Sequence, residues 1–183
     1  MSATSHPPGD LLGSCCRSAS VAQTTALMLK SGAIADVTFV RDVLLESPQR
    51  FAGLAAAFAR LQTLHEGYLL NHLGRLGRQT AYERVAHLLL ELCQRSAAVG
   101  LSDAGASPLP LTQEVLADAL GLSLVHINRT LQQLRRDGLL EIRASSLRLL
   151  DADRLAAIAE YQPPRQPVVA RDRRDLSAAA RVR

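Results

Sequence analysis

The chain has 183 residues, and 48% of them are hydrophobic, which suffices for one or two small domains with packed cores. Only 3% are aromatic and none is Trp, so those cores must be built from Leu, Ala and Val. The net charge is +4, but residues 162–183 carry six Arg against Asp172 and Asp175, which accounts for all of it. The basic composition therefore does not by itself indicate a nucleic-acid-binding domain.

Neither membrane insertion nor secretion is indicated by the sequence. No stretch approaches the roughly 18 consecutive apolar residues of a membrane span, and the N-terminus lacks a signal-peptide pattern. We therefore expect a cytoplasmic protein without a membrane partner. The three cysteines, two of them adjacent at Cys15 and Cys16, fit neither a disulfide framework nor a metal-ligand spacing. No catalytic or phosphate-binding arrangement is recognisable, and we expect neither an enzyme nor a bound cofactor or metal.

The first 46 residues give a mixed pattern. Residues 1–20 are small and polar, residues 21–29 favour a β-strand, and Ser31-Gly32 interrupts the chain after them. Residues 35–46 favour a helix, although the β-branched and aromatic run at 37–40 weighs against it.

A long helix is predicted next, over residues 48–73. Ser47 is a suitable N-cap, and Pro48 is favourable at the first helical position. Large side chains then recur at alternating spacings of three and four, which is the heptad pattern of a helix that pairs with another helix. These candidate dimerisation residues are Phe51, Leu54, Phe58, Leu61, His65, Tyr68 and His72. The seam is expected to form a symmetric homodimer, and packing within the chain's own fold is the alternative.

Two further features of this helix bear on its function. Two histidines in one seam can act as a pH sensor or metal site, but such residues are more often partly solvated seam positions. Gly74 and Gly77 are expected to interrupt the helix and to leave a hinge. A second helix is predicted over residues 80–96, with one apolar face formed by Val85, Leu88, Leu89 and Leu92. The Gly/Pro/Ser-rich residues 97–110 are expected to form a loop.

Residues 112–136 have the pattern of two short helices joined by a glycine turn. Thr112 can cap a helix over Gln113–Leu120, Gly121 suits a left-handed C-terminal residue, and Ser123 can cap the next helix. In that second helix, Leu124–Arg136, the side chains of Ile127, Leu131 and Leu134 lie within about 60° of each other and must face inward. This arrangement predicts a helix-turn-helix.

The outer face of the second helix carries the side-chain types that read DNA. Arg can bind guanine, and Asn or Gln can bind adenine, through paired hydrogen bonds in the major groove. The alternative is an ordinary solvated helix face. The candidate DNA-binding residues are Thr112, Ser123, Leu124, Val125, His126, Asn128, Arg129, Gln132, Gln133 and Arg136.

The following residues predict the wing of a winged helix. Residues 139–142 and 147–150 have the pattern of two strands joined by a turn at 143–146. Asp151 can then cap a last short helix that extends to about Tyr161.

The chain resembles the Crp/Fnr transcription regulators from "GRQTAYERVAHLLLEL" through "LPLTQEVLADALGLSLVHINRTLQQLRRDGLLEI" to "LRLLDADRLAAIAEY". With the long helix, the resemblance covers roughly residues 48–161. It implies a homodimer whose recognition helices enter successive major grooves of a palindromic site, and RNA polymerase as a further partner that is recruited or blocked. The family's base-reading positions fall on Leu124, Val125, His126, Asn128 and Arg129.

The N-terminal part departs from that family. "PPGDLLG", Arg17-Ser18-Ala19 and "TTALMLKS" resemble the end of a sensory β-roll, but only 47 residues precede the long helix. Most of the strands that would form a ligand pocket are therefore expected to be missing, and no cyclic nucleotide, haem or iron–sulfur cofactor is expected.

These observations predict a mainly α fold with four parts. A truncated remnant of a cyclic-nucleotide-binding-type β-roll (1–47) precedes a dimerisation helix and hinge (48–77). A winged helix-turn-helix DNA-binding domain (78–161) and a disordered Arg-rich tail (162–183) follow. The predicted function is sequence-specific transcription regulation by a homodimer. The alternative is a truncated interaction protein that pairs with a full-length relative and modulates it.

Overall fold

The computed structural model describes residues 33, 38–47, 49–103 and 105–164. The predictions of a strand at 21–29, of a β-roll remnant and of a disordered tail after residue 164 lie outside the described residues. The chain divides into two compact units, with a boundary between Tyr68 and Leu69. Leu69–Pro163 form the larger unit, and the other one contains residues 38–68; each is described by itself.

The smaller unit contains helix α1 (Thr38–Glu46) and the beginning of α2 (Ala52–Arg78). A helix was predicted over 35–46, and the structure has one from Thr38. The prediction that Ser47 and Pro48 start the long helix is wrong. The Ser47 N–H donates to the Val43 carbonyl at 3.0 Å, so Ser47 closes α1. The first bond of the new helix runs from Ala55 N to Phe51 O at 2.9 Å.

Helix α2 continues through Gly74 and Gly77, where a hinge was predicted, and ends at Arg78. A glycine weakens a helix by only about 1 kcal/mol relative to alanine and does not by itself end it. Here the helix is held on both sides of Gly74, because His72 and Arg75 are buried. The chain turns only at Gln79 and Thr80.

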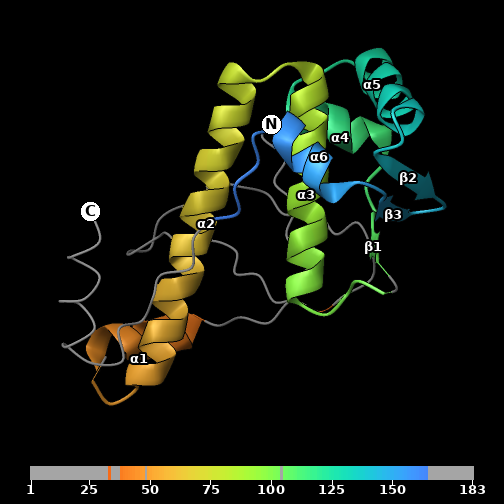
Figure 1. Cartoon of the computed structure of the whole chain (residues 1–183). Coiled ribbons are helices and arrows are strands. Elements are labelled where there is room, and N and C mark those ends of the chain that lie inside the picture. Colours follow the sequence, from red (N-terminus) through yellow and green to blue (C-terminus); the bar gives the residue numbers. More distant parts are fainter. Residues whose placement is uncertain (1–32, 34–37, 48, 104, 165–183) are drawn as a thin grey trace, which may run out of the picture. The chain divides into compact units, whose positions relative to one another are not determined.

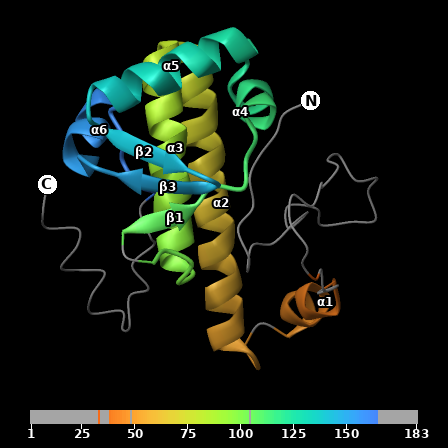
Figure 2. The same ribbon diagram turned by 90° about the vertical axis from the view of Figure 1, so that its right-hand side faces the viewer.

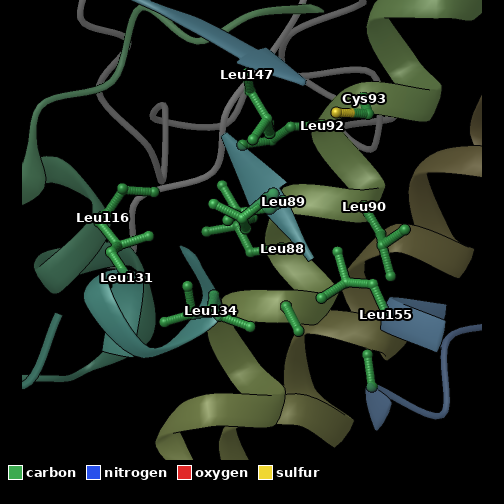
Figure 3. Packing of buried hydrophobic residues seen from close by; sticks show 14 of the residues in the cluster. Leu88, Leu89, Leu90, Leu92, Cys93, Leu116, Leu131, Leu134, Leu147 and Leu155 are labelled. Atoms are coloured by element: carbon green, nitrogen blue, oxygen red, sulfur yellow. The ribbon is translucent and has the colours of Figure 1, made fainter. Parts of the chain in front are cut away.

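Helix α3 (Ala81–Ala98) is the centre of the larger unit. Thr80 and Glu83 form a capping box at its start, since each side chain binds the other residue's backbone N–H. The predicted inward face is confirmed, because Val85, Leu88, Leu89 and Leu92 are all buried. Figure 3 shows Leu88 and Leu89 near Leu131 and Leu134 of helix α5 (Leu124–Arg136) and Leu116 of helix α4 (Gln113–Leu120), and all of these belong to one buried cluster with Leu92. Helix α5, helix α6 (Ala152–Ile158) and strand β1 (Ala106–Pro108) all pack on α3.

The remaining elements surround α3. They are β1 (Ala106–Pro108), α4 (Gln113–Leu120), α5 (Leu124–Arg136), β2 (Leu140–Arg143), β3 (Ser146–Leu149) and α6 (Ala152–Ile158). The three strands form an antiparallel sheet in the order β1-β3-β2. Figures 1 and 2 show the sheet beside α3 and α5 across one end of α3.

Two predictions in this unit need correction. Residues 97–110 are not only a loop, because β1 pairs with β3 in the register Ala106↔Arg148, Ser107↔Leu147 and Pro108↔Ser146. A proline is tolerated there because β1 is an edge strand, where one row of backbone groups has no partner strand. The last helix ends at Ile158 rather than near Tyr161, since the backbone becomes left-handed at Glu160 (φ 46°).

Candidate nucleic-acid interface

Two N-caps and one left-handed glycine form the corner between α4 and α5. The Thr112 hydroxyl accepts a hydrogen bond from Val115 N, and the Ser123 hydroxyl accepts one from His126 N, both at 3.3 Å. Gly121 lies in the left-handed region at φ 60°, which a residue with a Cβ adopts only with strain. The predicted caps and C-terminal glycine are thus confirmed, and they define a helix-turn-helix.

The inner face of α5 fixes the orientation of the helix. Ile127, Leu131 and Leu134 are at most 3% exposed, as their spacing predicts. Thr130 is also buried, although it was not included in the predicted stripe. It lies three residues after Ile127 and four before Leu134, which places it beside the same stripe, so helical geometry could have identified it.

The outer face of α5 is a continuous exposed surface. The apolar side chains of Val125 and Leu124 are 70% and 41% exposed. The side chains of His126, Arg129, Gln132, Gln133 and Arg136 are exposed, and Asn128 is half-buried. The fold therefore presents the predicted α5 set on one side of the helix, away from the core. Thr112 and Ser123 lie at the helix starts, with their hydroxyls used in the caps.

The β2–β3 hairpin adds a second charged element beside α5. Its turn residues Ala144 and Ser145 both have positive φ, 47° and 72°, which is the geometry of a two-residue hairpin turn. Arg143 and Arg148 on the strands are exposed, and Arg143 forms an ion pair with Glu141. Arg135 of α5 and Arg143 of β2 line the same shallow groove with Leu150. Arg143 was not among the predicted site residues, and only the fold brings it to the same groove as Arg135.

The end of α5 is anchored to α3 by a short hydrogen bond. The Tyr82 hydroxyl donates to Asp137 Oδ2 at 2.6 Å, and Asp137 is the C-terminal cap of α5. Burial and this hydrogen bond raise the pKa of Tyr82 to about 12, so the phenol stays protonated and keeps donating. Arg84, also on α3, donates from Nε to the Gln79 carbonyl at 2.7 Å and contacts the last carbonyl of α4. Both helices of the helix-turn-helix are therefore tied to one support.

The predicted dimerisation residues have unequal positions in α2. Phe51 and Leu54 are 38% and 47% exposed, whereas Phe58, Leu61, His65 and Tyr68 are half-buried. His72 is buried within its own chain, and its Nδ1 lies 3.0 Å from Arg75 Nη2. Burial and the Arg75 charge lower the pKa of His72, which favours the neutral ring. The exposed apolar residues in this part of α2 are instead Leu69, Leu70 and Leu73.

Neither a metal site nor a membrane-spanning helix is found in the part of the chain that the structure describes. No group of His, Cys, Asp and Glu side chains there is arranged to hold a metal ion. No described helix combines the length and apolar character needed to cross a bilayer.

Comparison with known proteins covers the same part of the chain. Residues 83–158, which contain the helix-turn-helix and the hairpin, match the family of the Crp-like helix-turn-helix domain. The nitrogen fixation regulation protein FixK of Azorhizobium caulinodans is 39% identical over 102 residues, which are 56% of this chain and 39% of the relative. The transcriptional activator protein FnrA of Stutzerimonas stutzeri is 30% identical over 159 residues, 84% of this chain and 62% of the relative.

The chain spans less than two thirds of the length of these relatives, 39% and 62% respectively. Among solved structures, FixK2 from Bradyrhizobium japonicum is similar over 68% of this chain and 58% of that chain. It has 28% sequence identity and a TM-score of 0.49.

Proposed function

The chain belongs to the Crp/Fnr family of transcription regulators, and we propose that it binds a palindromic DNA site as a homodimer. The observation that carries the proposal is the outer face of α5, which exposes Val125, Arg129 and Gln132. The opposite face of this helix is buried in the core, which fixes its orientation. A helix of this kind fits the major groove, where each base pair presents a distinct set of donors and acceptors. Such a regulator would act in the cytoplasm, where the bacterial chromosome lies.

The basic side chains of the interface divide into two roles. Arg129 lies in the second turn of α5, close to the end that the Ser123 cap defines, so its guanidinium is placed to bind a guanine edge. Arg135 and Arg136 lie in the last turn. Together with Arg143 on β2, they are suited to contact phosphates, which strengthens binding to every sequence alike.

The candidate contacts at the start of α5 set the target sequence. Leu124 and Val125 are exposed and apolar, so they can contact a thymine methyl group but cannot donate to a base. His126 and Asn128 supply polar contacts beside them, and Gln132 and Gln133 lie one turn further along the helix. The preferred half-site should therefore combine a thymine opposite Leu124 or Val125 with a guanine opposite Arg129.

Pairing of two copies through α2 would place two such helices on one duplex. The exposed or half-buried residues Phe51, Leu54, Phe58, Gln62, His65, Leu69, Leu73 and Leu76 recur at spacings of three, four and four. This eleven-residue repeat corresponds to about 3.67 residues per turn, closer to an undistorted helix than a heptad is. The seam avoids His72, whose side chain is already packed inside its own chain.

The family resemblance supports RNA polymerase as a further partner, which the bound dimer recruits or blocks. Whether the outcome is activation or repression depends on where the site lies in a promoter.

The proposal is tested by selecting binding sites for the purified chain from random duplexes. We expect a palindromic consensus, and two chains per duplex by analytical ultracentrifugation. Arg78→Ala, which removes one exposed positive charge outside α5 and the hairpin, serves as the matched control and should select the same consensus. Selection of no common sequence, or of a single non-repeated half-site bound by one chain, would refute the proposed function.

A further inference from the structure

Four polar side chains are buried where α2 meets α3. His72 and Arg75 come from the last turns of α2, Glu91 comes from the middle of α3, and Arg95 comes from its last turn. Their exposed fractions are 7%, 3%, 3% and 5%. All four lie in the unit that contains the helix-turn-helix.

These side chains form one connected network centred on Glu91. Arg75 Nη1 lies 2.9 Å from Glu91 Oε2, and Arg95 Nη1 lies 3.4 Å from Glu91 Oε1. The other terminal guanidinium nitrogen of Arg75, Nη2, lies 3.0 Å from His72 Nδ1. A guanidinium can only donate, so His72 Nδ1 must accept and the ring carries its proton on Nε2. Arg75 thus bonds to both helices at once.

The network is costly for an element that only stabilises packing. The network removes the charged side chains of Arg75, Glu91 and Arg95 from water, and Arg75 Nε has no hydrogen-bond partner. Desolvation makes such buried ion pairs weak contributors to stability, and apolar replacements are often as stable or more so. Hydrogen bonds and ion pairs have a required geometry, so they can fix the rotation of one helix relative to the other. Contacts between leucine side chains have no such directional requirement.

The two helices joined by Arg75 have different tasks under the proposed function. Helix α3 supports α5, since Leu89 of α3 packs with Leu134 of α5 in one core. The last turns of α2 expose Leu69 and Leu73 on the side that the proposed seam uses. The ion pair between Arg75 and Glu91 therefore connects the proposed seam on α2 with the helix that supports α5.

We propose that Arg75 and Glu91 are positioning residues for DNA recognition, which fix α5 relative to the end of α2 and thereby set the half-site spacing. This inference rests on the proposed function. A symmetric dimer reads half-sites about one helical turn apart, and one inserted base pair rotates a half-site by roughly 35°. If the junction between α2 and α3 is rigid, the dimer should bind poorly to a site with an added base pair. If the junction is loosened, the dimer should tolerate the added base pair.

A second set of bonds should keep the domain folded when Arg75 is replaced. Gln79 Nε2 donates to the Ala159 carbonyl at 2.6 Å, and the Tyr161 hydroxyl donates to Gln94 Oε1 at 2.8 Å. In Arg75→Met, Glu91 also retains Arg95, so the substitution leaves no unpaired carboxylate. Arg75→Lys keeps the charge but cannot span Glu91 and His72 with a planar fork.

The experiment measures binding of the full chain to its selected palindrome and to versions with one or two base pairs added or removed between half-sites. The wild type should favour one spacing by about tenfold or more, as a distortion of 1.4 kcal/mol implies. Arg75→Met and Arg75→Lys should bind all spacings within about threefold, or 0.65 kcal/mol. Both should keep the dimer mass and the preference for the correct half-site sequence. Gln94→Met removes the uncharged hydrogen bond between α3 and Tyr161, and it should keep the wild-type spacing preference.

The outcomes separate the two proposals. A wild type that binds no palindrome overturns the proposed function and this inference with it. A wild type with one preferred spacing, shared unchanged by both Arg75 variants, overturns the inference alone. If Arg75→Met lacks a cooperative urea transition, Arg75→Lys decides the question.

Discussion

The ring of His87 on α3 meets the ring of Tyr161 edge-on, with centroids 4.8 Å apart and planes at 89°. Both rings are buried, at 5% and 8% exposure, and the histidine nitrogens have no room to hydrate. The contact joins the segment after α6 to the same helix that supports α5. It also places a titratable group where a charge is unfavourable.

This contact predicts a stability that depends on pH. Burial, followed by the Arg75 charge, lowers the pKa of His87 to about 4 from 6.5. The unfolded chain therefore binds more protons between those values, and the free energy of unfolding should fall as pH drops from 6.5 towards 4. The full loss is on the order of 3 kcal/mol, and no dependence on His87 is expected above about pH 7.5. The lowered pKa of His72 acts in the same direction.

Urea denaturation at pH 5 and pH 7.5 measures this effect. His87→Phe keeps a ring against Tyr161 and should flatten the difference between the two pH values. His126→Gln removes an exposed histidine from α5 and should leave the difference as in the wild type. A wild-type difference that His87→Phe does not reduce would contradict this account.

Arg129→Ala should reduce specificity, whereas Arg136→Ala should reduce affinity without regard to sequence. One bidentate contact with a guanine is worth about 1–3 kcal/mol of discrimination. Loss of one phosphate contact should weaken all complexes and lower the salt slope by about one. Both variants are titrated against the selected site and a scrambled duplex at several salt concentrations. The assignment is wrong if Arg129→Ala keeps the specific-to-scrambled ratio, or if Arg136→Ala abolishes it.

Leu69→Lys should convert the dimer into monomers, whereas Leu70→Lys should not. The two side chains are similarly exposed, at 56% and 61%, but they lie about 100° apart around α2. Only Leu69 belongs to the eleven-residue repeat, so only its replacement places a charge in the proposed seam. Sedimentation equilibrium at tens of micromolar distinguishes the two results. Equal effects of the two substitutions would show that pairing does not follow this repeat.

Two glycine-to-alanine substitutions should have opposite effects on the free energy of unfolding. Gly121→Ala places a Cβ on a left-handed residue (φ 60°) and should destabilise the protein by roughly 1–2 kcal/mol. Gly74→Ala lies inside α2 with no atom within 4 Å of the new Cβ, and it should stabilise the protein by up to about 1 kcal/mol. Chemical denaturation monitored by circular dichroism gives both values. A stabilising effect of Gly121→Ala would mean that the corner between α4 and α5 does not need a left-handed residue.

The helix-turn-helix could be read from the sequence because its signals are local. Thr112, Gly121 and Ser123 act on residues within one turn of themselves, and the apolar spacing of Ile127, Leu131 and Leu134 needs only helical geometry. The predicted bounds of α4 and α5 agree with the structure for this reason. The outward set on α5 followed from the same periodicity.

The remaining features depend on partners far away in the chain, which no local pattern specifies. Strand β1 exists because Ser107 pairs with Leu147, forty residues later. His72 fits a heptad by spacing, but it is buried because Arg75 reaches Glu91 on the next helix. The same burial holds α2 together through Gly74, where the sequence predicted a hinge. Tertiary contacts outweigh helix-propensity differences of about 1 kcal/mol. The sequence by itself therefore determined helix α5 and its outward face, whereas the tertiary structure decided which residues support that helix.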